Sequence, residues 1–549
     1  MNIDDCSIDH KHIYSMKLKK LFILTTTCIT ILSATSCSKL DVDVESQYVK
    51  DNFPTTSGDY AALYGTMYSN LSSQYGVPYF RMQELSTDAA ILPARDGNFD
   101  DGGQYRQLHY HTWTFDHPNV KTIWEWGFGG INNCNRLIAV TNESSVSEAT
   151  KLAGITEIRA MRSLYYFLMM DLYGNVPIID QFPIAANELP GTTSRDKVFE
   201  FIEKELLEII PNLPHKTAAN QTLLYGKPTS GMAFALLAKM YLNAAVYTGK
   251  PKYADAVKMA DSVMANTTYM LDSKYSAIFD PNNGPQVSET IFAIPYDQQI
   301  PGNQITRFGF YPALAAAYGI TGVGFSISMS TTPEYFNRFN LENDIRNTFW
   351  LVGKQFAPDA NRQPDQTKPV YISGTTTQIE ITPDLVLKPG KPMDVGNTVA
   401  DQAKGVRSVK YWPDVNAIQA TRLNGNDMPF LRLADVMLMK AEAILRGAQP
   451  TAVNGELQTP LILVNKIRAR AGAPAAAIVD LESLLDERAR ELSWEAWRRN
   501  DLIRFGLFEK EYPLPNDVLK MNKDLTRRLY PIPATELQLN SNLKQNPGY

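Results

Sequence analysis

EIRAMRSLYYFLMMDLYGNVPII, residues 157–179, is the stretch of sequence that predicts the fold most clearly. Its apolar side chains recur three or four residues apart, which is the spacing of one face of an α-helix. They are Ile158, Met161, Leu164, Tyr165, Leu168 and Leu172. Gly174 ends the pattern, as glycine commonly does just beyond a helix. The sequence therefore predicts a helix over 151–173 with one face buried against other helices.

The same helical spacing recurs on both sides of this stretch. The predicted ranges are 56–75, 119–145, 195–210, 229–247 and 252–267, and further along the chain 430–446, 456–471 and 481–505. The 229–247 range is rich in alanine, which lets helices approach closely. Residues 253–261 have the small-residue spacing of a tetratricopeptide-type second helix, although no strict repeat is present. These ranges predict a mostly α-helical fold.

Residues 275–428 have a different character, since they are rich in Gly, Pro, Thr and Asn and poor in long helical periods. Two short strands are predicted there, over 289–295 and 406–412. Long connections in a compact protein are usually functional or disordered. We therefore expect an irregular, loop-rich, ligand-facing insertion carrying short strands. It would lie between an N-terminal helical scaffold over 54–274 and a C-terminal helical scaffold over 429–549.

Residues 1–36 have the features of a secretory signal peptide. Three lysines follow Met16, an apolar run covers 21–32, and small residues precede Cys37. The apolar run is too short to cross a bilayer as a helix, which needs about 20 residues. A cysteine directly after the small residues is typical of a lipoprotein, in which that cysteine is acylated. Ala34 departs from the pattern, because leucine is common at that place.

Cys37 is therefore the predicted lipidation site, and residues 37–53 are predicted to be a tether that links the lipid to the fold. Cys134 is the only other cysteine after the leader, so no internal disulfide can form. We expect Cys134 to be a small, buried side chain. The alternative is an ordinary secreted protein in which Cys37 occupies this place by coincidence.

Charge and aromatic content restrict the class of partner. The net charge is −5, and a mildly acidic protein argues against nucleic acid or anionic lipid as a partner. The chain contains 27 tyrosines. Many aromatic side chains in an exported protein favour carbohydrate binding, because the C–H face of a sugar packs on an aromatic ring. Most aromatic residues nevertheless build cores.

The first candidate ligand site lies in the loop-like stretch 86–118, chiefly in RDGNFDDGGQY at 95–105, here named the Asp-Gly loop. Its glycines favour a tight, exposed turn. A sugar site needs polar groups beside a flat apolar surface, and this stretch supplies both. The candidates are Asp88, Arg95, Asn98, Phe99, Asp100, Asp101 and Tyr105. A solvated loop, or a calcium-binding loop given its three acids, is the alternative.

The second candidate is RFGFYPALAAAYGITGVGF at 307–325, here named the aromatic segment. Its rings stand in a Gly- and Ala-rich context without helical periodicity. They are Phe308, Phe310, Tyr311 and Tyr318. They could form a stacking platform for a ligand or, alternatively, a small core of the insertion itself. Trp350 and Trp412 are weaker candidates.

Three glutamates, Glu487, Glu491 and Glu495, recur four residues apart among several arginines. Glycosidases place two carboxylates on opposite sides of the scissile bond, whereas these share one predicted helix face. We therefore predict ion pairs and not catalysis. His109 and His111 have no third ligand nearby for zinc, and we expect them to be structural.

The chain contains no nucleophile elbow, phosphate-binding loop or dinucleotide fingerprint. We therefore predict no catalytic residue, no enzymatic activity and no cofactor. A structural calcium ion in the Asp-Gly loop is the one exception that the residues leave open.

Several segments together resemble the SusD/RagB family of outer-membrane, nutrient-binding lipoproteins. The carrying segments are 157–179, GKPTSGMAFALLAKMYLNAAVY (226–247), FLRLADVMLMKAEAIL (430–445), LILVNKIRARAGAP (461–474), LDERARELSWEAWRRNDLIRFG (485–506) and LYPIPATELQLNSNLKQNPGY (529–549). Their order, the leader and the final NPGY agree with the family over essentially the whole chain after the leader.

The resemblance implies a mostly helical, tetratricopeptide-like scaffold on the cell surface, with a ligand site built partly from early loops. It implies a protein that caps a TonB-dependent transporter, holds an oligosaccharide or polysaccharide for import and does no chemistry. Three alternatives remain open: a peptide-binding member of the same family, a secreted glycoside hydrolase, and a scaffold that binds only proteins. The resemblance does not identify the ligand.

Overall fold

The helix α6 (Glu148–Tyr173) contains the stretch that predicts the fold. Ser147 caps its start, because the Ser147 hydroxyl accepts a hydrogen bond from the Thr150 N–H (3.2 Å). Gly174 follows its last turn with a φ of 70°. All side chains from Ala160 to Tyr173 are buried. The second half of α6 is thus enclosed on every side, not only along the one predicted stripe.

The structure is a computed structural model that describes residue 54 and residues 56–184, 188–298, 303–320, 324–326, 328–417 and 423–549. The predicted signal peptide (1–36) and tether (37–53), with Cys37, lie outside the described residues. Cys134 is fully buried, as predicted. No helix among the described residues is both long enough and apolar enough to cross a membrane.

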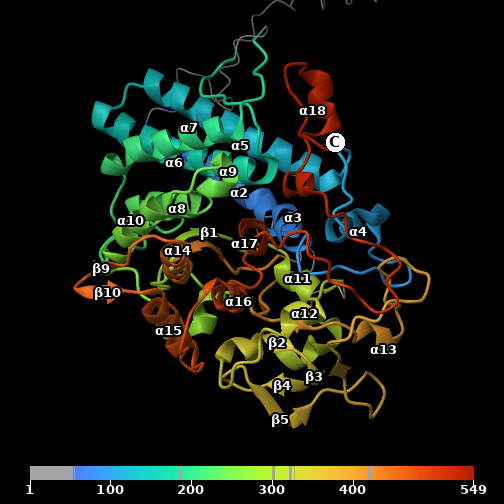
Figure 1. The fold of residues 1–549 in the computed structure, drawn as a ribbon. Helices are drawn as coiled ribbons and strands as arrows, with labels where there is room; N and C mark the ends of the chain where they lie inside the picture. Colours follow the sequence, from blue (N-terminus) through green and yellow to red (C-terminus); the bar gives the residue numbers. More distant parts are fainter. Residues whose placement is uncertain are drawn as a thin grey trace, which may run out of the picture. The chain divides into compact units, whose positions relative to one another are not determined.

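The first half of the described chain is helical. Its helices are α2 (Ser57–Gln74), α3 (Phe80–Glu84), α4 (Gln104–His109), α5 (Pro118–Glu143), α6, α7 (Arg195–Ile209), α8 (Ser230–Leu242), α9 (Ala244–Thr248) and α10 (Tyr253–Met264). A π-helical turn over Tyr75–Tyr79 joins α2 to α3. α5 packs on α2 and α6, α6 on α7, and α8 on α10. Figure 1 shows α5 to α10 stacked on one another, with α4 apart from this stack, which confirms the predicted packing of helix pairs.

The middle of the chain has little regular structure. It contains α11 (Ile305–Gly309), α12 (Pro333–Phe336), α13 (Val399–Gln402), β1 (Thr290–Ile294), β2 (Trp350–Leu351), β3 (Gly353–Lys354), β4 (Phe356–Pro358), β5 (Pro364–Pro369), β6 (Glu380–Ile381), β7 (Arg407–Ser408) and β8 (Met428–Arg432). The strands form antiparallel pairs: β1 with β8, β2 with β7, β3 with β6, and β4 with β5. The first predicted strand is confirmed, whereas the second shortens to Arg407–Ser408.

Helices resume after β8, which occupies the start of the predicted 430–446 helix. The elements are α14 (Leu433–Leu445), β9 (Thr451–Val453), β10 (Glu456–Gln458), α15 (Pro460–Ala471), α16 (Leu481–Glu491), α17 (Arg498–Phe505) and α18 (Ala534–Leu539). β9 and β10 pair, and α14 packs on α8, α10, α15 and α16. Residues 55–549 form one compact unit whose main core runs through both helical halves.

The predicted single helix over 481–505 is wrong, because the chain leaves the helix between α16 and α17. Trp494 and Ala496 have positive φ values of 56° and 65°. Buried tertiary contacts hold this turn: the Ala496 N–H donates to the Glu84 carboxylate (2.6 Å), and the Trp494 indole donates to the Ala89 carbonyl (2.8 Å). Long-range hydrogen bonds therefore override the local helical preference.

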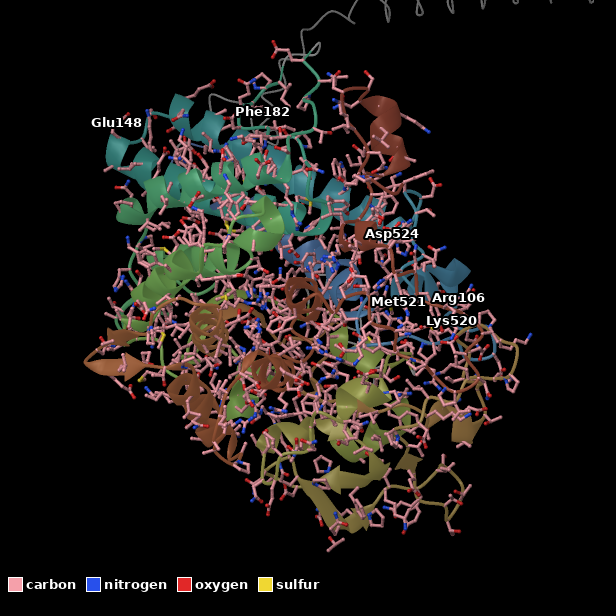
Figure 2. All side chains as sticks on the ribbon, in the orientation of Figure 1. Arg106, Glu148, Phe182, Lys520, Met521 and Asp524 are labelled. Carbon is pink, nitrogen blue, oxygen red and sulfur yellow. The ribbon has the colours of Figure 1, made fainter. Side chains whose placement is uncertain are left out.

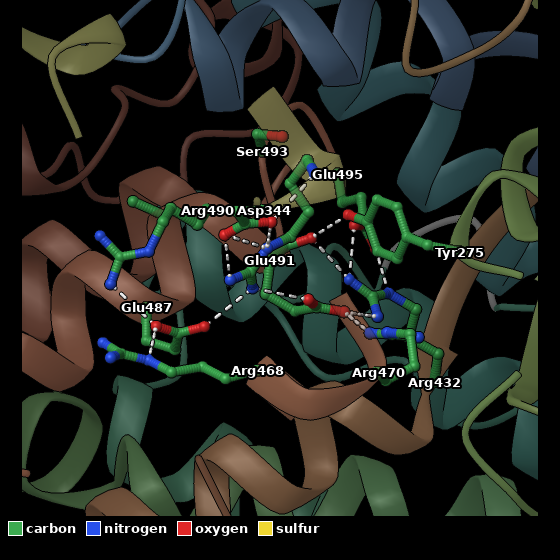
Figure 3. A network of polar contacts seen from close by, with 12 residues as sticks. Tyr275, Asp344, Arg432, Arg468, Arg470, Glu487, Arg490, Glu491, Ser493 and Glu495 are labelled. Atoms are coloured by element: carbon green, nitrogen blue, oxygen red, sulfur yellow. Dashed lines mark hydrogen bonds and ion pairs between the residues drawn. The ribbon is translucent and has the colours of Figure 1, made fainter. Parts of the chain in front are cut away.

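The three glutamates of this region form buried ion pairs, as predicted. Arg432 binds Glu491 (2.6 Å), Glu495 (2.7 Å) and Glu289 (2.7 Å). Glu487 and Glu491 also bind Arg346 (2.8 and 3.0 Å). Figure 3 shows how these side chains converge between α16 and the strand β8 that ends at Arg432. The network joins the middle of the chain to the C-terminal helices.

Candidate functional site

The Asp-Gly loop and the aromatic segment meet in the structure although they are far apart in the sequence. Arg81 of α3 joins them: its guanidinium lies 4.9 Å from the ring centre of Tyr105 and 4.4 Å from that of Phe308. Figure 1 shows α3 beside α11, the helix that carries Phe308. Nearby, the backbones of Ile91 and Ser330 exchange two hydrogen bonds of 2.7 and 2.9 Å. The two predicted segments therefore meet at Arg81.

The Arg81 guanidinium is the central polar group where the two segments meet. Burial lowers its pKa, while the nearby Tyr105 and Asp101 oppose that shift. Among the described residues it makes no hydrogen bond and no ion pair, and the two rings alone hold it. Its five N–H donors therefore have no acceptor among the described residues. A fixed donor plane beside aromatic faces is the combination that sugar recognition needs.

A second aromatic group lies further along the aromatic segment. The half-buried rings of Tyr318 and Trp412 pack with their centres 5.3 Å apart. The guanidinium of Arg362 lies 4.7 Å from the Trp412 ring and binds Asp280 (2.6 Å). These three side chains line a small pocket of about 50 Å³. Beneath them, the fully buried Phe310 meets Tyr318 edge-on at 5.1 Å.

Asp394 fixes the tip of the Asp-Gly loop. Its carboxylate accepts hydrogen bonds from the backbone N–H groups of Asp96 (3.0 Å), Gly97 (3.3 Å) and Gly396 (2.8 Å). Asp96 also forms an ion pair with Lys388. Arg106, the residue after the loop, lies near Lys520 and Met521 in Figure 2. Close by, the Asn522 N–H donates to the Tyr110 carbonyl (2.8 Å). The loop is thus anchored before any ligand arrives.

Replacing Asp394 with alanine should loosen this loop, because three backbone N–H groups lose their common acceptor. We expect hydrogen exchange at Asp96, Gly97 and Gly396 to accelerate roughly tenfold or more. Mass-spectrometric hydrogen exchange measures this directly. Asp359 is a matched control, since it also accepts two backbone hydrogen bonds of 2.8 Å in a turn. D359A should leave the exchange of Asp96, Gly97 and Gly396 unchanged. If these three amides exchanged equally fast in D359A and D394A, the role given to Asp394 would be contradicted.

Two of the predicted polar residues lie in the interior. Asp88 is fully buried, and its carboxylate accepts two 2.7 Å hydrogen bonds from Arg498 and lies 3.1 Å from Arg338. Arg95 is also fully buried and donates to the carbonyls of Asp401 (2.7 Å) and Lys404 (3.4 Å). Both side chains hold the loop to the fold, and we leave them out of the contact surface proposed below.

Two predicted rings are also interior. Phe310 and Tyr311 belong to a small second core, which is the alternative that the sequence left open for the aromatic segment. Its buried members are Phe310, Tyr311, Leu314, Ile320, Leu351, Ile379, Ile381 and Val409. This core supports Tyr318 and Trp412, which pack against it from the outside.

Asn98, Phe99 and Asp100 lie at or near the surface of the Asp-Gly loop, whereas Tyr105 is only 6% exposed and belongs to the main core. Asn98 is exposed and donates to the Arg95 carbonyl (3.0 Å). Phe99 is half-buried with a φ of 62°. Asp100 is half-buried and paired with Arg106. Burial raises the pKa of Tyr105 to about 12, so its hydroxyl stays protonated and able to donate.

His109 and His111 are buried side chains that contact other protein groups, as expected for structural histidines. His111 is fully buried; its ring stacks on Phe508 (4.3 Å), and its Nε2 lies 2.8 Å from the Ser86 carbonyl. Burial lowers the pKa of His109 to about 4, so this ring is neutral. Within the described ranges, no three His, Cys, Asp or Glu side chains are grouped so that they could hold a metal ion.

Sequence reasoning missed Arg81 and Arg362. Arg81 was detectable in principle, because it is a lone arginine in the aromatic and apolar stretch VPYFRM at 77–82. A charged residue in such a stretch needs a partner. The partner could not be read from the sequence, since Phe308 lies in a distant segment. Arg362 gives no signal in its polar surroundings.

The comparisons with known proteins agree with this architecture. The model of the SusD family (SusD_RagB) matches residues 259–549, which is more than half of the chain. The chain belongs to the SusD family. The starch-binding protein SusD of Bacteroides thetaiotaomicron is 26% identical over 503 residues, covering 86% of this chain and 85% of that protein. The resemblance expected from the sequence is confirmed.

Solved structures of SusD-like proteins share the fold. Surface glycan-binding protein A of Bacteroides thetaiotaomicron, solved with laminarihexaose, aligns with a TM-score of 0.70 and 20% identity. The alignment covers 90% of this chain and all of the other. A SusD superfamily protein of Parabacteroides distasonis aligns over the same shares with a TM-score of 0.69 and 21% identity. The mostly helical SusD-like fold is therefore confirmed.

Proposed function

We propose that this protein binds an oligosaccharide or polysaccharide outside the cell and delivers it to a TonB-dependent transporter for import. The observation that carries the proposal is the surface where the Asp-Gly loop meets the aromatic segment. There the guanidinium of Arg81 has no hydrogen-bonding partner among the described residues and lies over the rings of Tyr105 and Phe308. The relatives named as starch-binding and as bound to laminarihexaose support the same ligand class.

The proposed contact residues come from both predicted segments and from the groups that the structure adds. They are Arg81, Asn98, Phe99, Asp100, Phe308, Tyr318 and Trp412, while the buried ring of Tyr105 supports Arg81. The rings offer apolar faces to the C–H side of sugars, while the arginine, the amide and the carboxylate exchange hydrogen bonds with hydroxyls. Asp88, Arg95, Phe310 and Tyr311 position this surface from below.

We further propose that the protein does no chemistry on its ligand. Its most conspicuous carboxylates, Glu487, Glu491 and Glu495, are buried and already bound to arginines. Hydrolysis of a glycosidic bond needs two carboxyl groups exposed to the substrate, one on each side. Buried glutamates that are already paired with arginines cannot reach a substrate. These three residues therefore cannot be the catalytic carboxyl groups of a glycosidase.

The cellular location of the protein is also part of the proposal. We propose that the leader is removed, that Cys37 is lipidated, and that residues 37–53 tether the body to the outer face of the outer membrane. This would let the protein close over a transporter while it remains attached. A genomic neighbour that encodes a TonB-dependent receptor, and co-purification of that receptor with the protein, would support the partnership.

Affinity electrophoresis against a panel of polysaccharides that includes starch and laminarin tests the ligand class. At least one polysaccharide should retard the protein, while bovine serum albumin as a non-binding control should migrate unchanged. If no polysaccharide retards it and a peptide library binds instead, the protein is a peptide-binding member of the family. Released reducing sugar during incubation would contradict the absence of chemistry.

A further inference from the structure

A second concave surface lies among elements that do not contribute to the proposed glycan site. This groove has a volume of about 710 Å³ and runs between α9, the end of α17, the turn Leu525–Arg528 and residues 546–547. Aliphatic side chains form most of its wall, among them Val246, Ile503 and Leu529. Its size is that of a ligand-binding pocket, and no predicted function accounts for it.

Three arginines line the groove, and two of them have carboxylate partners. Arg504 binds Glu442 through two hydrogen bonds of 2.6 and 2.7 Å. Arg528 binds Glu509 through two hydrogen bonds of 2.6 and 2.8 Å. Their charges are therefore compensated within the protein, and they offer a ligand little net attraction.

Arg195, the third arginine, differs from the other two. Its guanidinium donates to the carbonyls of Met170 (3.1 Å) and Asp171 (3.1 Å) and lies 4.4 Å from the Tyr247 ring. Among the described residues it forms no ion pair with a carboxylate. Burial lowers the pKa of Arg195, and the charge of Asp171 opposes that shift.

The Asp171 carboxylate does not bind Arg195, because it accepts hydrogen bonds from Tyr247 (2.8 Å), Asn500 (2.8 Å) and Gln83 (3.3 Å). Arg195 thus keeps hydrogen-bonding capacity and a positive charge at the edge of the groove. A guanidinium of this kind matches a carboxylate, which it binds with two parallel hydrogen bonds.

The rest of the groove favours aliphatic chains over sugar rings. Its lining contains one aromatic ring, Phe505, against the aliphatic side chains of Ala245, Val246, Ile503, Leu525 and Leu529. Leu525 is 62% exposed on the wall. An exposed aliphatic side chain in the same groove as an arginine that has no ion pair among the described residues fits a ligand that carries a carboxylate among apolar groups.

We propose that this groove docks a segment of a partner polypeptide in which one acidic residue is flanked by apolar side chains. The acidic residue pairs with Arg195, and the apolar neighbours cover Leu525, Val246 and Leu529. The inference is independent of glycan binding, because the groove shares no residue with the surface around Arg81. A free carboxylate without apolar neighbours would gain the ion pair alone and bind weakly.

Fluorescence anisotropy with a fluorescein-labelled peptide, Leu-Phe-Glu-Leu-Phe, tests the proposal on the purified protein. Both peptides are amidated at the C-terminus, so that the Glu side chain is the only carboxylate of the peptide chain. The Glu peptide should bind, and the equally labelled Leu-Phe-Gln-Leu-Phe peptide should bind about tenfold more weakly, because it lacks the charge for Arg195. Arg195→Gln should weaken binding of the acidic peptide by a similar factor. Lys197→Gln, on the same helix α7 but paired with Glu200 and outside the groove, is the matched control.

Leu525→Glu is a second test in case the Arg195 variant does not fold. Leu525 is exposed, so its replacement leaves the core unchanged. The new carboxylate repels the acidic peptide, so L525E should weaken its binding at least about tenfold while glycan retardation stays unchanged. No binding of the acidic peptide, or equal binding by wild type, R195Q and L525E, would overturn the proposal. If the wild type bound the acidic peptide but was retarded by no polysaccharide, the proposed glycan-binding function would fail and the groove proposal would stand.

Discussion

Replacing Glu491 with glutamine should destabilise the protein by about 3–5 kcal/mol, the usual cost of removing one partner from a buried ion pair. Glu491 is fully buried and serves three guanidinium groups at once. Its carboxylate binds Arg432 (2.6 Å), Arg346 (3.0 Å) and Arg470. Burial alone would raise the pKa of Glu491, but these three charges hold it well below its usual range. Three buried arginines would lose their shared counter-charge.

Urea unfolding followed by circular dichroism measures this effect as a shift of the midpoint. Glu200→Gln is the control, because Glu200 pairs with Lys197 at the surface, where both side chains are 58% exposed. Its replacement should leave the midpoint nearly unchanged, since exposed pairs contribute little. A midpoint for E491Q equal to that of E200Q would show that the network of Figure 3 does not hold the fold together.

Replacing Arg81 with glutamine should lower the affinity for the bound polysaccharide roughly ten- to a hundredfold, because hydrogen bonds from a charged group are lost. The neighbouring ring of Phe308 remains, so part of the stacking surface survives. Isothermal titration with an oligosaccharide of the polysaccharide identified by electrophoresis gives the dissociation constant. Melting curves recorded in parallel show whether R81Q stays folded.

Arg136→Gln is the matched control for R81Q. Arg136 lies on α5, its guanidinium donates to the Asn133 side-chain oxygen (2.9 Å), and it belongs to neither predicted segment. Its replacement should not change the affinity. An unchanged affinity in a folded R81Q protein would mean that the ligand binds elsewhere, although membership in the SusD family would stand.

The helical scaffold could be predicted from local patterns, because each stretch carries its own evidence. The stripe from Ile158 to Leu172 specifies a helix without reference to the rest of the chain, and the structure contains that helix. The break between α16 and α17 could not be predicted in this way. It depends on Glu84 and Ala89, which accept hydrogen bonds from residues more than 400 positions away.

The site was predictable only as two separate segments. Composition identified the Asp-Gly loop and the aromatic segment, but sequence cannot show that Arg81 brings them together. For the same reason Asp88 resembled a ligand residue: its partner Arg498 lies 410 positions further along the chain. A polar side chain in a loop-like stretch can face a ligand or a distant arginine, and only the tertiary fold decides between the two.

A crystal structure with the oligosaccharide that binds most tightly in titration tests the central claim most directly. The proposal predicts sugar rings on the face formed by Phe308 and by Tyr318 with Trp412, and a sugar hydroxyl or carboxylate within hydrogen-bonding distance of the Arg81 guanidinium. Density for the oligosaccharide only at positions that touch none of these four side chains would contradict it.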